Sequence, residues 1–338
     1  MSAAIQPTML WENSNPHTVL AQRFHFATTD DATHWLIDRI GSTYGLTVVS
    51  VDRLVMSSYN LLAWLTTTQG ALLAKCCAFV TAHQRLRQVG ELVVWLEQMT
   101  LPVAAPLVAT VGSVQVLCDH LSISLQRVIP GELLDPTQSV QATKAGVVLA
   151  QLHQALATYP YATALATPAP IPSLPTQLAQ WAQQKKATLA DPTLIANLAS
   201  LQAQVGQLAT TTLPTQLVHG DYRAANVLWR ENDIAAVLDF EEVRWGYRVN
   251  DLAWAAVHLG TRYHDWGPLA LAVQQTFLQS YRAAHPLDAA EEAWLPALLA
   301  WHSLTLTLQT TADNPAYQIG LETIAFYLEL LQTDRPLP

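Results

Sequence analysis

The stretch Leu217-Val-His-Gly-Asp-Tyr-Arg-Ala-Ala-Asn-Val-Leu-Trp229 is followed closely by Ile234-Ala-Ala-Val-Leu-Asp-Phe-Glu241. Both stretches contain short apolar runs, which are typical of buried strands. The polar side chains fall between or directly after these runs. They are His219, Asp221 and Asn226 in the first stretch and Asp239 in the second. The pattern therefore predicts short strands over 216–219, 226–229 and 234–238, with four chemically active groups at their ends.

These residue types suit one kind of chemistry. A carboxylate can orient an attacking hydroxyl and accept its proton. Carboxylate and amide oxygens are also ligands that Mg²⁺ prefers. Phosphoryl transfer from a nucleotide needs both functions. We therefore expect Asn226 and Asp239 to hold magnesium and Asp221 to act as the base.

The composition bounds the class of protein. The chain has 338 residues, of which 51% are hydrophobic and 13% charged, and it carries a formal net charge of −9. A chain of this length and apolar content folds compactly and is the reverse of a disordered composition. The negative charge gives no long-range attraction for phosphate backbones or anionic lipids. We therefore expect neither a nucleic-acid partner nor a membrane partner.

The cysteines and the N-terminal sequence point to a reducing compartment. Cys76, Cys77 and Cys118 are too few for a disulfide framework and lack zinc-ligand spacing with histidine. The first residues show no secretory signal, and no stretch reaches the roughly 20 apolar residues that span a bilayer. We expect a cytoplasmic protein with buried thiols.

The first 130 residues predict mainly strands. A capped helix runs from Thr29 to near Gly41, and three strands joined by tight turns follow between Leu46 and Cys76. Residues 79–99 have a helical period. Strand-like runs return at 103–111 and 114–118.

The remainder of the chain is mainly helical. Pro130-Gly131 marks a break, and a Pro-rich loop covers 167–175. Helices are predicted near 138–159, 176–190 and 193–209, and then from 250 to the end. The fold class is therefore α+β, with an N-terminal nucleotide-binding lobe over 1–128, a hinge near 126–132 and a helical lobe over 129–338.

The spacing His219-x-Asp221-x-x-x-x-Asn226, with Asp239-Phe-Glu241 after the next strand, resembles the aminoglycoside phosphotransferase and choline kinase group, near type II homoserine kinase-like members. The resemblance implies a bilobal protein-kinase-like fold. It also implies ATP and Mg as cofactors and transfer of the γ-phosphoryl group to a hydroxyl of a small metabolite.

The resemblance extends to a lysine and a glutamate in the first lobe. In such kinases a lysine on the third strand holds the nucleotide phosphates and pairs with a helix glutamate. Lys75 ends the third predicted strand, and Glu91 lies on the following helix before Leu101-Pro-Val103. Glu97 on the same helix is the alternative to Glu91.

The nucleotide-phosphate loop is expected at Met56-Ser-Ser-Tyr-Asn-Leu61, where the sequence departs from a glycine-rich loop. Phosphate contacts must then come from Ser57, Ser58 and Asn60 and from backbone N–H groups. Adenine is expected to dock on backbone groups of the hinge, at Gln126 and Val128.

Four further polar residues have expected roles. His219 holds the catalytic loop, and Arg223 either helps the transferred phosphoryl group or pairs with an acid. His153 resembles a scaffold histidine of the family. Asp251, in Asp-Leu-Ala253, is expected mainly as a helix cap that could also steady the catalytic loop.

The acceptor is expected among the C-terminal helices, which are rich in aromatic residues and histidines. Aromatic faces can bind a quaternary ammonium, but most large rings at helical spacing belong to the core. The acceptor is thus an amino acid or amino alcohol by preference, or a choline-like compound or aminoglycoside. A protein Ser/Thr kinase and a nucleotide-binding pseudokinase are the alternatives, and the oligomeric state is open. The candidate lining residues are Trp245, Tyr247, Trp254, His258, Tyr263, His264, Trp266, Trp294, Trp301 and His302.

Overall fold

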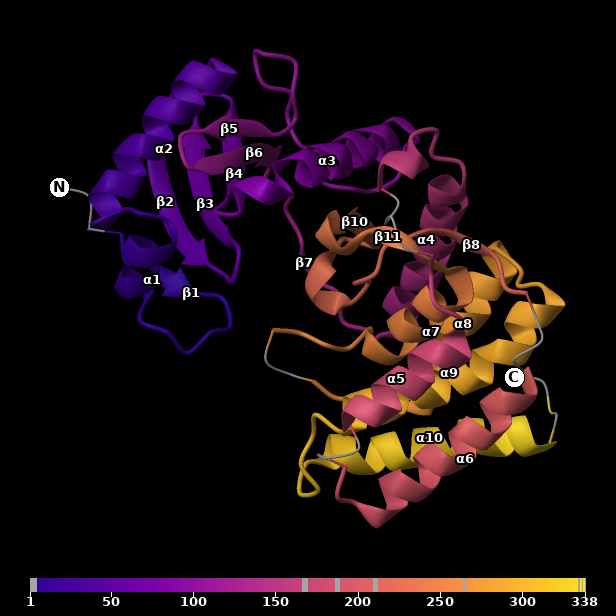
Figure 1. Ribbon diagram of the computed structural model, residues 1–338. Helices are drawn as coiled ribbons and strands as arrows, with labels where there is room; N and C mark the ends of the chain where they lie inside the picture. The colour runs from indigo at the N-terminus through magenta and orange to yellow at the C-terminus, as the bar shows by residue number, and fades with distance from the viewer. Residues whose placement is uncertain are drawn as a thin grey trace. The chain divides into compact units, whose positions relative to one another are not determined.

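The computed structural model describes residues 5–165, 170–185, 189–208, 212–263, 266–333, 335 and 337. The chain divides into two compact units, Met1–Pro130 and Gly131–Pro338. Figure 1 shows a sheet with helices in the first unit and mainly helices in the second. The predicted α+β class, with a strand-rich first part and a helical second part, is confirmed.

The N-terminal unit is built on a six-stranded sheet with the order β1-β2-β3-β4-β6-β5. The three strands predicted between residues 46 and 76 are present, and they pair in sequence as antiparallel neighbours. An edge strand that was not predicted runs parallel to the end of β2. The strands are β1 (Thr8–Met9), β2 (Val48–Met56), β3 (Asn60–Thr67), β4 (Gly70–Cys77), β5 (Val116–Cys118) and β6 (Leu121–Arg127).

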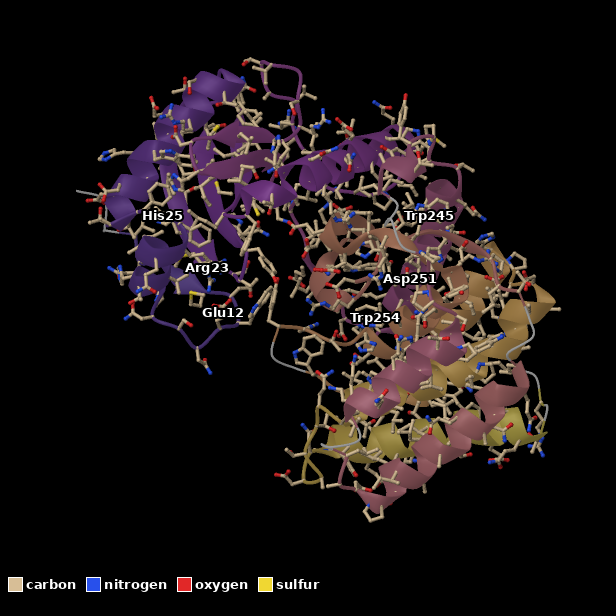
Figure 2. The ribbon with its side chains drawn as sticks, in the orientation of Figure 1. Glu12, Arg23, His25, Trp245, Asp251 and Trp254 are labelled. Atoms are coloured by element: carbon tan, nitrogen blue, oxygen red, sulfur yellow. The ribbon has the colours of Figure 1, made fainter. Side chains whose placement is uncertain are left out.

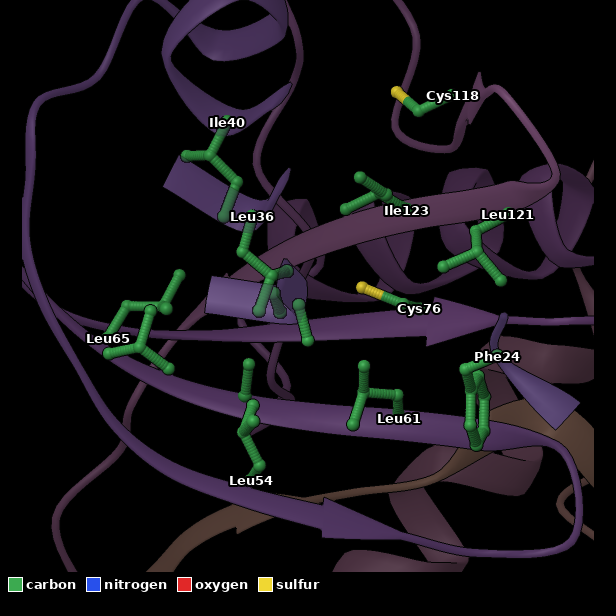
Figure 3. Close-up of a cluster of buried hydrophobic side chains, with 14 of the residues drawn as sticks. Phe24, Leu36, Ile40, Leu54, Leu61, Leu65, Cys76, Cys118, Leu121 and Ile123 are labelled. Atoms are coloured by element: carbon green, nitrogen blue, oxygen red, sulfur yellow. The ribbon is translucent and has the colours of Figure 1, made fainter. Parts of the chain in front are cut away.

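One face of this sheet forms the core of the unit, with α1 (Pro16–Arg23) and α2 (Thr29–Tyr44) packed on it (Figure 3). Alternate residues of β3 and β4 point into the core, as the period of a strand requires. Helix α2 contributes residues at spacing four, which lie on one helix face. The core residues include Leu61, Ala63, Leu65, Leu72, Ala74 and Cys76 from the strands and Ala32, Leu36 and Ile40 from α2.

A predicted helix end and a predicted strand in this unit are wrong. Helix α2 does not stop near Gly41 but continues to Tyr44, because Gly45 adopts the left-handed conformation (φ 66°) and donates its N–H to the Gly41 carbonyl. The run 103–111 forms no strand. Pro102 precedes it and Pro106 interrupts it, and neither can donate to a sheet ladder. The helix predicted over 79–99 is confirmed as α3 (His83–Gln98).

The C-terminal unit combines small sheets with long helices. The three predicted short strands are confirmed as β8, β9 and β10, and two additional strands, β7 and β11, pair with them. Most helices begin and end within a few residues of the predicted positions. The Pro-rich segment falls partly outside the described residues. The strands are β7 (Glu132–Leu133), β8 (Thr215–Val218), β9 (Val227–Arg230), β10 (Asp233–Val237) and β11 (Arg244–Tyr247). The helices are α4 (Ser139–Ala157), α5 (Leu174–Lys185), α6 (Pro192–Leu208), α7 (Arg248–His258), α8 (Leu271–Ala284), α9 (Ala289–Thr307) and α10 (Pro315–Thr333).

Two further features of the chain are the state of its cysteines and the character of its helices. All three cysteines are free and buried, as expected. Among the described residues, no helix has the length and apolar character needed to cross a membrane.

Candidate active site

Short-range backbone pairing brings the two motif segments together. Strands β9 and β10 form an antiparallel hairpin in which Val227 faces Val237. Directly after the hairpin, the N–H of Leu238 donates to the Asn226 carbonyl at 2.8 Å. The Leu238 carbonyl in turn accepts from Nε2 of His219 at 3.2 Å. Leu238, the residue before Asp239, is therefore hydrogen-bonded to both ends of the loop 219–226, which carries Asp221.

Two side chains of its own loop hold the Asp221 carboxylate. Arg223 Nε lies 3.0 Å from Oδ1 and 3.1 Å from Oδ2. Asn226 Nδ2 donates to Oδ2 at 2.7 Å and to the Asp221 carbonyl at 2.9 Å. A carboxylate oxygen can accept two hydrogen bonds, so Oδ1 keeps room for one more donor.

Burial and nearby charges set the proton affinity of Asp221. Burial raises the pKa of its carboxyl group to about 6, and the charge of Asp239 also raises it. Arg223 and the hydrogen bond from Asn226 lower the pKa but do not cancel the effect of burial. A carboxylate with a pKa near 6 is mostly ionised at neutral pH and accepts a proton more readily than an ordinary aspartate.

His219 is a neutral positioning group. Its side chain is buried, and burial lowers its pKa. Because Nδ1 accepts the N–H of Asp221 at 3.1 Å, Nε2 carries the hydrogen that goes to the Leu238 carbonyl. Its ring packs edge-on against Phe240 with centroids 4.7 Å apart. His219 therefore orients the loop backbone, and its part in the reaction stays a prediction.

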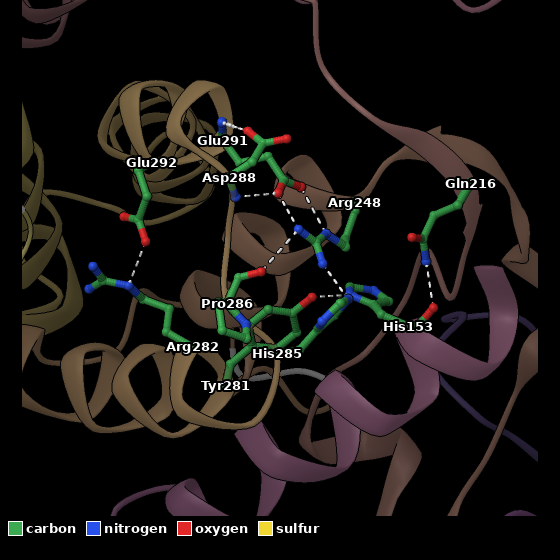
Figure 4. A network of polar contacts seen from close by, with 10 residues as sticks. All are labelled: His153, Gln216, Arg248, Tyr281, Arg282, His285, Pro286, Asp288, Glu291 and Glu292. Atoms are coloured by element: carbon green, nitrogen blue, oxygen red, sulfur yellow. Dashed lines mark hydrogen bonds and ion pairs between the residues drawn. The ribbon is translucent and has the colours of Figure 1, made fainter.

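A buried layer behind the loop fixes its backbone. Asp251 accepts the N–H of Gly220 at 2.9 Å and the Nε2 hydrogen of His153 at 2.9 Å. Nδ1 of His153 lies 2.7 Å from the Tyr281 hydroxyl (Figure 4). Burial alone would raise the pKa of Asp251, but the contacts with His153 and nearby positive charges lower it. Asp251 thus steadies the loop backbone at Gly220, whereas the sequence analysis favoured a helix-cap role for it.

The oxygen ligands proposed for magnesium fit the ion. Asn226 turns its amide NH₂ toward Asp221, and its Oδ1 accepts no hydrogen bond from the described residues, so it is available as the kind of oxygen ligand that Mg²⁺ prefers. Asp239 follows the hairpin in a left-handed conformation (φ 58°), which is uncommon for a residue with a side chain. Such backbone outliers concentrate at functional sites. One amide and one carboxylate oxygen suit an ion that completes its shell with phosphate and water oxygens.

Arg223 carries an unusual guanidinium group. Its Nε is bound to Asp221, and its Cζ lies 5.4 Å from the centroid of the Trp266 ring. Its Nη1 is buried and has no hydrogen-bond partner among the described residues. An unpaired buried donor is costly, and a charged one suits an anionic group that arrives with the substrate.

Lys75 and Glu91 belong to the N-terminal unit. Lys75 lies on β4 opposite Leu62 and Ser124, on the sheet face away from the core, and is half-buried. Glu91 is exposed on α3 and lies 3.8 Å from Arg87, one helical turn earlier. The pairing of Lys75 with Glu91, or with Glu97, stays a prediction.

The residues expected to contact the nucleotide lie in or next to the paired strands of the same sheet. Ser57 and Asn60 close the turn between β2 and β3, and both are buried. Ser58 donates its hydroxyl to Glu12. At the predicted hinge, Gln126 pairs with Leu73, and the N–H of Val128 donates to the Ala71 carbonyl at 3.1 Å. That N–H is therefore already used by the sheet.

The candidate aromatic residues of the C-terminal unit include a buried core side chain and two stacked Trp/His pairs. Trp294 is buried, as core residues are. Trp254 stacks on His258 with ring centroids 4.3 Å apart, and Trp301 stacks on His302 at 5.6 Å. Burial lowers the pKa of His258 to about 4 and that of His302 to about 3. Both histidines are therefore neutral at physiological pH. Figure 2 labels Trp254 and Asp251, which α7 carries; His264 lies outside the described residues.

Sequence reasoning missed two groups that contact residues named above. Tyr281 contacts His153 from α8, 128 positions away along the chain, and no local pattern marks it. Glu12, which bonds Ser58, precedes the helix α1 that the sequence analysis did not predict. Asn15-Pro16 is a recognisable helix start, with an N-cap residue before proline, and it could have revealed that helix.

Known proteins share this architecture. Residues 57–304 match the phosphotransferase enzyme family. An amicoumacin kinase in complex with AMP-PNP and Ca²⁺ is 14% identical, with a TM-score of 0.57 over 90% of this chain and 94% of that chain. A macrolide 2′-phosphotransferase from Brachybacterium faecium is 19% identical, with a TM-score of 0.54 over 86% of this chain and 97% of that chain.

A third solved structure agrees with these two. The GDP complex of an aminoglycoside 2′-phosphotransferase is 15% identical, with a TM-score of 0.57 over 93% of this chain and 97% of that chain. At these identities the structural likeness shows the fold, whereas the match over well over half of the sequence shows the family. The chain belongs to the phosphotransferase enzyme family and has its protein-kinase-like fold.

Proposed function

We propose that the protein transfers the γ-phosphoryl group of ATP, with magnesium, to a hydroxyl group of a small molecule. The observation that carries the proposal is the arrangement around Asp221. The amide of Asn226 donates to the proposed base and leaves an oxygen for a metal, while Arg223 Nη1 is buried beside them with no partner in the described part of the chain. A base, a metal ligand and a positive charge on one short loop are the parts that phosphoryl transfer requires.

In the proposed reaction, the acceptor hydroxyl donates to Oδ1 of Asp221. Its oxygen forms a bond to the γ-phosphorus as the bond from that phosphorus to the β,γ-bridging oxygen breaks, which releases ADP. The hydroxyl proton passes to the Asp221 carboxylate. Arg223 Nη1 would contact the transferred group and offset its negative charge. Magnesium held by Asn226 and Asp239 would supply charge neutralisation at the phosphate oxygens.

The short connection after the metal segment favours a small acceptor over a peptide. Only the turn Phe240–Glu242 and strand β11 lie between Asp239 and helix α7, which begins at Arg248. A protein kinase uses a longer segment there as a platform for peptide substrates. The presence of Asp221, Asn226, Asp239 and Lys75 together counts against a pseudokinase.

The acceptor class is best approached through the solved relatives. Their names specify antibiotics: amicoumacin, a macrolide and aminoglycosides. In this chain, Trp254 is partly exposed and stacks on the buried, neutral His258, which gives an uncharged aromatic face on α7. We therefore propose a neutral or singly charged acceptor, including amino alcohols and choline-like compounds, ahead of a polycation.

The test is an acceptor screen that measures ADP release with ATP and Mg²⁺. The panel contains homoserine, ethanolamine, choline, a macrolide, an aminoglycoside and a generic protein substrate. We expect one small-molecule class to stimulate ADP release and Asp221→Asn to lower that rate by roughly 10²-fold or more. Equal rates in the variant and the parent, at intact ATP binding, would remove Asp221 from its role.

A further inference from the structure

We propose that Glu12 and Arg23 are positioning residues that preorganise the phosphate-binding turn Ser57–Asn60 from outside the catalytic family region. The proposal rests on the proposed function, because it assumes that this turn meets the nucleotide phosphates. The matched family region begins at residue 57. Glu12 and Arg23 therefore lie in a part of this chain that precedes the matched region.

The turn itself is tight and contains no glycine. The N–H of Ser57 donates to the Asn60 carbonyl at 2.8 Å, and the N–H of Asn60 lies 3.2 Å from the Ser57 hydroxyl. Only Ser58 and Tyr59 remain at the tip, and neither N–H donates to another described residue. These two N–H groups are the backbone donors that the turn can offer to a phosphate.

Two side chains of the N-terminal segment form hydrogen bonds to this turn. Arg23 Nη1 donates to the Ser57 carbonyl at 2.7 Å. The Glu12 carboxylate accepts the Ser58 hydroxyl at 2.8 Å and is paired with Arg23 Nη2 at 3.2 Å (Figure 2). The same segment is aligned by the bond from the Leu10 N–H to the Met56 carbonyl, next to the pairing of β1 with β2.

The opposite side of the tip is also supported. The ring of Tyr59 packs edge-on against Phe79 with centroids 5.0 Å apart, and the N–H of Ala78 donates to the Tyr59 carbonyl. With the carbonyls of Ser57 and Tyr59 both engaged, the peptide groups at the tip cannot rotate freely. A glycine-rich loop gains its phosphate contacts through backbone freedom, whereas this turn is held in one conformation before the nucleotide arrives.

The pairing also solves an electrostatic problem. A bare carboxylate beside a phosphate site would repel ATP. Glu12 is not bare, because its hydrogen bond from Ser58 and its pairing with Arg23 disperse its charge. Because Arg23 makes the pair neutral overall, these contacts restrain the turn without adding a net negative charge near the phosphates.

The test compares the affinities of the full-length chain for Mg·ATP and for adenosine, measured by calorimetry. The variants are Glu12→Ala, Glu12→Gln, Ser58→Ala and the double variant Glu12→Ala/Ser58→Ala. Asp119→Ala is the matched control, because Asp119 accepts from Arg39 and Trp35 in the same unit at a different place. Urea unfolding of each variant checks that the unit remains folded.

We expect Glu12→Ala to weaken Mg·ATP binding by about 5-fold or more, since a charge-assisted bond is lost. Adenosine, which has no phosphates, should bind within about 2-fold of the parent, as should ATP to Asp119→Ala. Glu12→Gln retains an acceptor for Ser58 and should fall between the parent and Glu12→Ala. The double variant should be little weaker than Glu12→Ala alone, because both changes break one contact.

The outcomes separate the two levels of inference. An unchanged Mg·ATP affinity in folded Glu12→Ala, with normal binding by the parent, overturns the positioning role and leaves the proposed function standing. An equal loss of ATP and adenosine affinity also overturns it, because the defect then lies outside the phosphates. If the parent binds no Mg·ATP at all, the proposed function fails.

Discussion

At the scale of single residues, opposing effects set the pKa of the Asp221 carboxyl group. Its contacts with Arg223 and Asn226 favour the charged form, while burial and Asp239 favour the neutral form. The second pair prevails, and the pKa rises to about 6. A structural aspartate in an ion pair usually shows the reverse, so this carboxyl group has the properties of a proton acceptor.

The first prediction concerns pH. We expect log kcat/KM to fall with unit slope as the pH drops through about 6, because protonated Asp221 cannot accept the hydroxyl proton. At pH 7 about nine-tenths of the carboxyl groups are ionised, and at pH 5 about one-tenth. Rates with the acceptor identified by the screen measure this limb.

ATP also titrates in this range, so the control is a change of the protein. Arg223 lowers the pKa of Asp221, and Arg223→Gln should therefore move the acid limb to higher pH as well as lower the rate. A limb that stays at the same pH in this variant belongs to the nucleotide, and Asp221 would then not be the titrating base.

The second prediction ranks the nucleotide contacts. Lys75→Ala should weaken ATP binding more than Ser57→Ala, Ser58→Ala or Asn60→Ala does singly. A charged donor to phosphate contributes about 1.5–3 kcal/mol, against about 0.5–1.5 kcal/mol for a neutral hydrogen bond. Parallel ATP titrations decide the order, and a turn variant weaker than Lys75→Ala would contradict the role given to the third strand.

At the scale of elements, one buried ion pair joins the starts of α7 and α9. Arg248, the first residue of α7, bonds both oxygens of Glu291, and its Nε lies 2.8 Å from Oε1 (Figure 4). Glu291 also completes the capping box of α9 with Asp288. Because α7 carries Asp251 three residues later, this junction sets where the support of the catalytic loop begins.

The third prediction compares two neighbouring glutamates. Glu291→Ala should lower the free energy of unfolding by about 3–5 kcal/mol, because it leaves the buried charge of Arg248 without its carboxylate partner. Glu292 pairs with Arg282 at 3.0 Å on a more exposed surface, and Glu292→Ala should cost about 0–1 kcal/mol. Urea unfolding of both variants provides the comparison. Similar losses would mean that the buried pair contributes no more than the surface pair.

Local patterns predicted the elements that carry their own signals. The alternation of β3 and β4 and the period of α4 are visible in the sequence, and those elements are present. The run 103–111 is apolar and contains β-branched residues, but with Pro102 before it and Pro106 within it the run forms only isolated bridges. Strands β7 and β11 have two and four residues, and their existence depends on a partner strand rather than on a pattern of their own.

At the scale of the whole molecule, the site was predictable where its members are close in sequence. Asp221, Arg223 and Asn226 lie within six positions, and spacing alone groups them. His153 and Asp251 are 98 positions apart, and Gly220 and Asp251 are 31 apart. Their contact depends on how α4 and α7 pack, which no short motif encodes.

The fourth prediction concerns the metal in the intact chain. Mg·ATP at 100 times its dissociation constant should stabilise the folded protein by about 2.7 kcal/mol, and ATP with a chelator by less. Asp239→Ala should abolish the difference between the two, because it removes the one carboxylate assigned to the ion. Thermal unfolding in both buffers measures it. A magnesium effect of the same size in the variant would place the metal on other ligands.

The bond from the Gly220 amide to buried Asp251 has a consequence for motion. Loop amides ordinarily exchange their hydrogens with solvent within seconds, through small local openings. The Gly220 hydrogen can leave only when Asp251 of α7 is separated from the loop, which also disturbs the bond of Asp251 to His153 of α4 and, through His153, the bond to Tyr281 of α8. Its exchange in D₂O should therefore be as slow as that of the central helices, so the catalytic loop and the helical core open as one cooperative body.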